Sequence, residues 1–125
     1  MRPIRVRSPP AGGLFALVSR SHPDPATEAF LARLSLLDRR PMGSSLKFCR
    51  IAEVTADLYV RLGPTHEWDT AAGDAILSAA GGLVADRSGP RLRYGKTETG
   101  FRHDGFMASG DFRLSWDNDA VRPMP

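Results

Sequence analysis

The sequence has a single cysteine, Cys49, so an internal disulfide is excluded and no Cys/His metal cluster can be built. It also lacks a long apolar run, because the longest runs, such as Leu14 to Val18, are far too short to span a bilayer. Residues 1–7 carry charge with no apolar segment behind them, which argues against a signal peptide. We therefore expect a cytoplasmic protein without a membrane span.

Blocks of basic residues with interleaved aromatic residues are missing too. The net charge of +3 comes from scattered arginines, and only 8% of the residues are aromatic. This composition predicts no nucleic-acid partner and fits the attraction of a small polyanion. What is present is a chain of 125 residues, 42% hydrophobic and 25% charged, which suits one modest globular domain or one half of a larger one.

Hydrophobic patterns alternate between the strand and helix periods, which predicts an α/β fold with at least partly parallel strands. Strands are expected at 2–7, 14–19, 36–37, 56–61, 83–86 and 106–109, and helices at 25–34, 44–53 and 69–80. The sequence Arg39-Arg40-Pro41 is expected to end the third strand. We assign residues 1–112 to one α/β unit and residues 113–125, which show no pattern, to an irregular tail.

The segment 62–73 places an acid at a predicted helix start. Asp69 falls in the first turn, where unpaired N–H groups and the helix dipole favour a carboxylate or a phosphate. Asp69 either caps the helix or ligates a hard cation such as Mg²⁺. The buried face of this helix is expected to consist of small or apolar residues at helical spacing: Ala72, Ala75, Ile76, Ala79 and Ala80.

Basic residues near a turn rich in glycine and serine form a second candidate site. Gly43-Ser44-Ser45 can offer backbone N–H groups and hydroxyls to an anion, and Lys47 follows within one helical turn. Lys47 and Arg50 are expected on the exposed face of their helix, with Leu46 on the buried face, and the alternative is that Lys47 is a surface lysine without a role.

His22 follows a predicted buried strand, at the end of a sheet where α/β proteins bind ligands. A lone histidine in such a loop can equally be an ordinary surface residue. Arg61, at the end of another predicted strand, joins Lys47 and Arg50 as a candidate anion contact.

Several segments, in the same order, together resemble the C-terminal half of the inositol monophosphatase superfamily. The branch that they resemble most is the bacterial 3′(2′),5′-bisphosphate nucleotidases, over roughly residues 3 to 110. Each segment alone is weak evidence, and several in register are strong. The segments are Ser19-Arg20-Ser21-His22, Gly43-Ser44-Ser45-Leu46-Lys47-Phe48-Cys49, Ala56-Asp57-Leu58-Tyr59, Gly63-Pro64-Thr65, Trp68-Asp69-Thr70-Ala71-Ala72-Gly73, Ala79-Ala80-Gly81-Gly82 and Leu92-Arg93-Tyr94-Gly95-Lys96.

The resemblance implies a layered α/β sandwich, of which this chain is the C-terminal half, with a mixed sheet and flanking helices. It also implies a Mg²⁺-dependent phosphomonoesterase that removes the 3′-phosphate of adenosine 3′,5′-bisphosphate. Asp69 matches the metal-binding aspartate of the family's Trp-Asp motif. The residues that match nucleotide-binding positions are His22, Ser44, Ser45, Lys47 and Arg61, together with Asp69 itself.

The departures from the family pattern are as informative. The family's other metal ligands come from a glutamate and from an Asp-Pro-Ile/Leu-Asp-Gly-Thr motif, and this sequence has neither. One carboxylate cannot hold two or three metal ions, so the chain is expected to be inactive alone and to need a missing N-terminal half or a second chain. Val54 stands where the family usually has glycine, which puts the tight turn there in doubt, because a β-branched residue disfavours positive φ.

Two alternatives remain open at this point. The chain can belong to an inositol monophosphatase-type enzyme of other specificity, or it can be a non-catalytic protein. In the second case it is a truncated or decayed copy, or a nucleotide-binding module that pairs with another chain.

Overall fold

The computed structural model describes residues 4–8, 12–19, 24–34, 36–43, 46–86, 91–110, 113–114 and 121–122. Three predicted site residues, His22, Ser44 and Ser45, lie outside the described residues. Within the described part, no helix combines the length and the apolar character that crossing a bilayer requires.

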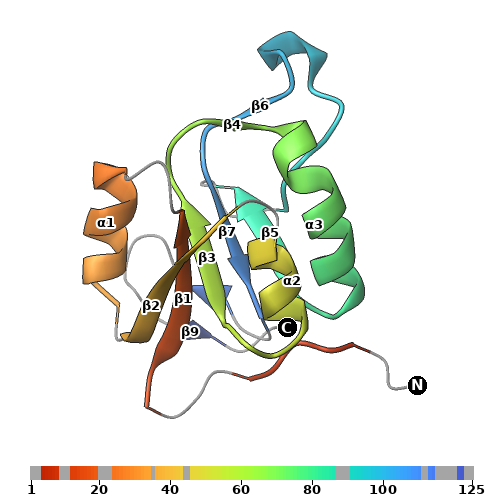
Figure 1. Cartoon of the computed structure of the whole chain (residues 1–125). Helices are drawn as coiled ribbons and strands as arrows, with labels where there is room; N and C mark the ends of the chain where they lie inside the picture. Colours follow the sequence, from red (N-terminus) through yellow and green to blue (C-terminus); the bar gives the residue numbers. More distant parts are fainter. Residues whose placement is uncertain are drawn as a thin grey trace.

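A mixed five-stranded sheet forms the centre of the fold, with the strand order β2-β1-β3-β7-β5 (Figure 1). Strand β1 runs parallel to β2 and β3, whereas β7 runs antiparallel to β3 and β5. The α/β prediction with partly parallel pairing is therefore confirmed. The strands are β1 (Leu14–Ser19), β2 (Leu36–Met42), β3 (Leu58–Arg61), β5 (Leu83–Asp86) and β7 (Phe106–Ser109).

Three helices cover the two faces of this sheet: α1 (Pro25–Ala32), α2 (Leu46–Ala52) and α3 (Glu67–Ala79). Figure 1 shows α1 on one side and α2 with α3 on the other. Leu58 and Val60 of β3 join the core that contains the apolar residues of α1, and Tyr59 joins the core beneath α2 and α3. Strand β3 alternates as predicted, and both of its faces are buried because each is covered by a helix.

The start of α1 follows the sequence prediction. Asp24 is the N-cap, and its carboxylate accepts hydrogen bonds from the Ala26 backbone N–H at 3.2 Å and from the Thr27 hydroxyl at 2.6 Å. Pro25 occupies the first helical position, where its missing N–H costs nothing.

The prediction that β2 ends before Arg39-Arg40-Pro41 was wrong. The strand continues to Met42, and Pro41 lies opposite Val18 of β1. Since β2 is at the edge of the sheet, a proline can sit there without removing a hydrogen bond from a central ladder.

The predicted strand at 2–7 is also wrong for its described residues, because residues 4–8 adopt no regular secondary structure. They are held by specific contacts instead. The Val6 N–H donates to the Ala80 carbonyl at 2.9 Å, and the Arg7 guanidinium makes two bonds, of 2.8 and 2.9 Å, to the buried Asp57 carboxylate. This bidentate pair attaches the segment next to the start of β3.

Short elements that the sequence patterns did not indicate complete the described chain. Strand β4 (Thr65–His66) pairs antiparallel with β6 (Arg102–His103), and the 3₁₀ helix η1 (Thr97–Thr99) lies between β5 and β6 in the sequence. In the region predicted to be an irregular tail, β8 (Arg113–Leu114) pairs with β9 (Val121–Arg122). Two-residue strands carry too little periodicity to be read from sequence.

Helix α3 begins two residues before the predicted start, and the prediction of its buried face was wrong. Of the residues expected there only Ala80, the C-cap, is buried, whereas Ala72, Ala75, Ile76 and Ala79 are exposed. The face that packs inward consists of Glu67, Thr70, Gly73 and Leu77.

The reason lies in the packing of α3 against α2. A Cβ atom on Gly73 would meet the Phe48 ring at 2.4 Å, so only glycine leaves room for this ring against α3. The expected faces of α2 are inverted in the same way at two positions, because Lys47 is only 3% exposed and Leu46 is 53% exposed.

The tight turn after α2 forms despite Val54. This residue has φ of 63°, in the left-handed region, and its N–H donates to the Ile51 carbonyl at 3.2 Å. The backbone geometry that glycine would suit is thus adopted by a β-branched residue, which stores strain in the turn.

Candidate active site

Asp69 lies in the first turn of α3 with an exposed side chain. Its Oδ2 accepts hydrogen bonds from the Thr65 hydroxyl at 3.0 Å and from the His66 N–H at 3.3 Å. Asp69 therefore caps the helix from its third position, by accepting the backbone N–H of the N-cap residue His66. This is one of the two roles that the sequence predicted. An exposed carboxylate engaged through one oxygen can still offer the other to a cation.

The other two described candidates lie around one side chain, Tyr59. The Lys47 ammonium is 4.7 Å from the centre of the Tyr59 ring, and it donates to the Met42 carbonyl at 2.8 Å. Burial raises the pKa of the Tyr59 phenol, whereas the charge of Arg61 and a hydrogen bond to its side chain lower it and the charge of Asp69 raises it. Lys47, Arg61 and Asp69, from α2, β3 and α3, thus all act on the Tyr59 side chain: Lys47 lies over its ring, Arg61 hydrogen-bonds its phenol, and Asp69 acts on it through charge alone.

Tyr59 itself was not singled out from the sequence as a site residue. It is 4% exposed, and its ring makes edge contacts with Phe48 at 5.5 Å and Phe106 at 5.2 Å. The signals in the sequence were its place in the segment Ala56-Asp57-Leu58-Tyr59 and in a predicted strand two residues before Arg61. Arg50, by contrast, does not join this group, because it forms an ion pair with Glu53 at 3.1 Å on the exposed side of α2.

The opposite side of the first turn of α3 carries a buried acid, Glu67. Its two carboxylate oxygens accept the backbone N–H groups of Gly95 at 2.6 Å and Lys96 at 2.9 Å. Burial alone would raise the pKa of Glu67, but these N–H groups and the charge of Lys96 hold it below its usual range. The carboxylate fastens the chain around residue 95 to the helix start.

His103 links this loop to α3. The Lys96 ammonium lies 2.9 Å from Nδ1 of His103, and Nε2 lies 3.1 Å from the Thr70 hydroxyl. Because an ammonium can only donate, Nδ1 is the acceptor and Nε2 carries the proton that Thr70 accepts. Burial, and then the charge of Lys96, lower the pKa of His103, so the neutral ring is the stable form in the folded protein.

Mg²⁺ needs several oxygen ligands in near-octahedral geometry. In the part of the chain that the structure describes, no group of three or more His, Cys, Asp or Glu side chains is placed to hold a metal ion. Asp69 can supply one ligand, and the described residues do not complete a magnesium site.

Comparison with known proteins decides the family. The sequence profile of the inositol monophosphatase family matches residues 2–117. The chain belongs to the inositol monophosphatase family. Within it, the chain is 48% identical over 94 residues to the 3′(2′),5′-bisphosphate nucleotidase CysQ of Buchnera aphidicola, and 43% identical over 106 residues to the CysQ of Escherichia coli K12. The resemblance stated from the sequence is thereby confirmed.

The fold agrees with this assignment. The crystal structure of CysQ from Bacteroides thetaiotaomicron, a bacterial member of the inositol monophosphatase family, matches with a TM-score of 0.71 and 36% identity. The match covers 83% of this chain and 40% of that one. The chain likewise spans 36% of the Buchnera protein and 41% of the E. coli protein, while 74% and 85% of this chain are matched. It therefore corresponds to part of a family member.

Proposed function

We propose that this chain is the C-terminal portion of a Mg²⁺-dependent 3′(2′),5′-bisphosphate nucleotidase that hydrolyses adenosine 3′,5′-bisphosphate to AMP and phosphate. The observation that carries the proposal is that Lys47, Arg61 and Asp69 all act on the Tyr59 side chain, in a chain 43–48% identical to nucleotidases of that name.

The charges of this cluster suit a substrate with two phosphates. Lys47 and Arg61 supply two cations, and a guanidinium can grip phosphate oxygens through paired N–H donors. The Met42 carbonyl holds the Lys47 ammonium over the Tyr59 ring. Because the lysine side chain is already fixed, anion binding costs little of its conformational entropy. An inositol monophosphate carries one phosphate on an uncharged polyol and would leave one of the two cations without a phosphate, which favours the bisphosphate nucleotide.

In the proposed reaction a water oxygen forms a bond to the 3′-phosphorus while the bond to the ribose 3′-oxygen breaks and that oxygen takes up a proton. Such reactions need charge stabilisation on both oxygens, which metal ions provide in enzymes of this type. Asp69 would hold one ion. Because the described residues do not complete the metal site, we propose that the isolated chain does not catalyse the reaction.

We further propose that the remaining part of the phosphatase, in a second chain or a longer one, completes the site. The outward face of α3 is suited to be covered. Ile76 is 44% exposed and Trp68 is 68% exposed, and the exposed residues Ala72, Ala75 and Ala79 would let another element approach closely.

Binding can be tested without catalysis. Isothermal titration calorimetry of the full chain with adenosine 3′,5′-bisphosphate should give saturable binding, weakened about tenfold or more in Arg61→Gln, as expected for loss of a charged hydrogen-bond donor. Arg50→Gln, an exposed arginine of α2 outside the cluster, is the matched control and should bind like the wild type. Tighter binding of inositol 1-phosphate would instead favour an inositol monophosphatase-type specificity.

Catalysis is tested by complementation. The chain is mixed with the part of E. coli CysQ that it does not match, and phosphate release from the nucleotide is followed with Mg²⁺. We expect release only from the mixture, and its loss in Asp69→Asn. Release by the isolated chain would contradict the proposed inactivity, and nucleotide binding without release in the mixture would favour a non-catalytic binding module.

A further inference from the structure

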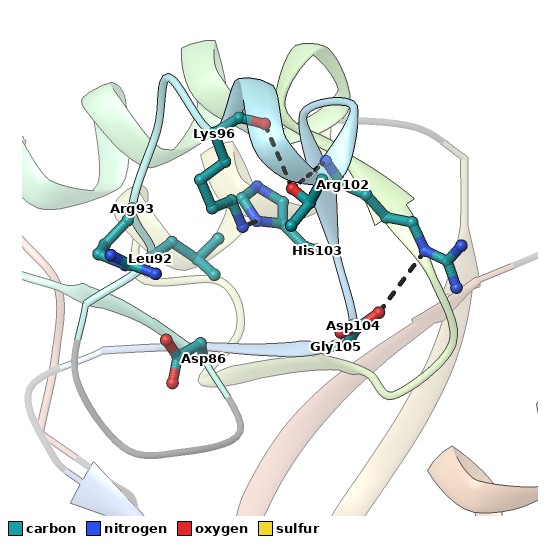
Figure 2. A pocket seen from close by; sticks show the side chains of 9 residues that line it. Asp86, Leu92, Arg93, Lys96, Arg102, His103, Asp104 and Gly105 are labelled. Atoms are coloured by element: carbon teal, nitrogen blue, oxygen red, sulfur yellow. Dashed lines mark hydrogen bonds and ion pairs between the residues drawn. The ribbon is translucent and has the colours of Figure 1, made fainter.

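A cavity lies beside the start of α3, and its lining includes none of Lys47, Tyr59, Arg61 and Asp69. Its volume is about 290 Å³, at the lower end of the range for small-molecule pockets. The chain from 92 to 105 forms most of its wall, with Asp86 from the end of β5. The residues used below are shown in Figure 2: Asp86, Arg93, Lys96, Arg102, His103 and Asp104.

The cations of this cavity outnumber its acids. Arg102 is compensated, since its guanidinium reaches Asp104 at 3.5 Å, as the dashed line in Figure 2 marks. Arg93 is exposed and forms no ion pair within the described residues. Lys96 is the third cation, so two positive groups face the cavity against the single remaining carboxylate, that of Asp86.

Lys96 is held in place from beneath. Its ammonium uses one of three N–H donors on Nδ1 of His103, a ring that is 1% exposed and is itself bound to Thr70. Within the described residues the two other N–H donors have no acceptor, and neither ring nitrogen of His103 has a free lone pair to offer. The backbone N–H groups of Gly95 and Lys96 are already bound to Glu67, so the loop that carries Lys96 is fixed before any ligand arrives.

We propose that this cavity binds a small tetrahedral oxyanion, a phosphate or a sulfate group, between Arg93 and Lys96. Such a group offers only acceptors and carries negative charge, which complements the ammonium of Lys96 and the guanidinium of Arg93, whose remaining donors have no partner among the described residues. Figure 2 shows Arg93 and Lys96 on the same segment of the chain, with the Lys96 side chain running to the His103 ring. Because Lys96 is connected through His103 to Thr70, the bound anion adds a link between the loop and the first turn of α3.

The test uses the full chain and inorganic anions as probes. Phosphate and sulfate are titrated separately in an NMR experiment that follows the backbone signals of Gly95 and Lys96 and the ring nitrogens of His103, against sodium chloride of equal ionic strength. We expect saturable shifts with at least one of the two oxyanions and none with chloride. The anion that binds more tightly identifies whether the cavity prefers a phosphate or a sulfate group.

Variants separate this site from the Tyr59 cluster. Arg93→Gln, an exposed substitution that keeps the fold, should weaken the anion about tenfold, and Lys96→Gln should weaken it as much or more. Arg61→Gln and Arg50→Gln should leave these shifts unchanged. Chloride-like behaviour of both anions, or unaltered binding in Arg93→Gln, would overturn the proposal. Loss of the shifts in Arg61→Gln alone would assign the anion to the nucleotide site and also overturn it.

Discussion

Two adjacent stripes of α3 differ in almost every respect. The inner stripe, Thr70, Gly73 and Leu77, is buried and in contact with α2 and with the loop at 91–105. The outer stripe, which includes Asp69 and Ile76, is exposed. One helix therefore separates the interactions that hold this chain together from those that are available to a ligand or a partner.

The largest expected effect is on the inner stripe, at Gly73. Gly73→Ala places a methyl group 2.4 Å from the Phe48 ring, which cannot move without disturbing Tyr59 and Phe106. We expect a loss of about 3 kcal/mol in the free energy of unfolding, measured by urea denaturation. Ala75→Ser, on the exposed side of the same helix, is the matched control and should change stability by less than about 0.5 kcal/mol. Equal effects of the two substitutions would refute the division into stripes.

A smaller effect is expected from pH, through His103 behind the inner stripe. In the unfolded chain a histidine has a pKa near the ordinary value of 6.5, whereas in the folded protein burial and Lys96 lower it. Unfolding therefore takes up a proton as the pH falls below about 6.5, so this contribution to stability is present above that pH and is lost below it.

Denaturation of the wild type at pH 7.5 and 5.5 should show the loss, and His103→Gln, whose side chain does not titrate, should reduce the difference between the two pH values. A pH dependence that is the same in the variant would place its origin elsewhere.

On the outer stripe, Asp69→Asn should separate stability from function. The amide keeps the shape of the cap but loses the charge that favours a helix start, so we expect a cost of about 0.5–1 kcal/mol. Phosphate release in the complementation mixture should fall to background, because the proposed metal ligand is lost. A large loss of stability would mean that the main role of the Asp69 carboxylate is to stabilise the fold.

The smallest effect on the isolated chain is expected at Ile76. Ile76→Lys should leave its stability within about 0.5 kcal/mol of the wild type, because the side chain is 44% exposed. The same substitution should weaken association with the unmatched part of CysQ, measured by analytical ultracentrifugation. Unchanged association would show that the outer stripe is not the contact surface.

The sequence located most helices and strands, but it did not predict which face of α3 is directed toward the core. The start of α3 was predicted within two residues, yet its buried face was assigned mainly to alanines. Alanine is tolerated in a core and on a surface alike, so its spacing cannot choose between them. The buried face is fixed by the packing of the Phe48 ring of α2 against Gly73, and these two residues are 25 positions apart in the sequence.

Some residues of the candidate site were named from the sequence and others were not. Lys47, Arg61 and Asp69 were named from turn chemistry and from the family resemblance, and in the structure all three act on the Tyr59 side chain. Lys47 is buried rather than exposed, because the Met42 carbonyl and the Tyr59 ring receive its ammonium. Glu67 and Lys96 were not foreseen, since their roles depend on a loop that folds back across 28 and 29 positions.

By itself, therefore, the sequence determined the order of the five strands of the main sheet and of the three α-helices, the family and the position of the acid at the start of α3. These properties depend on local periodicity, on capping chemistry and on motifs in register along the chain. Only the tertiary structure decided which stripe of α3 is buried, that a phenol joins the two cations, and that a cavity with uncompensated positive charge lies beside the same helix. Each of these arises from side chains far apart in sequence, whose packing and charges act only once the sheet has brought them together.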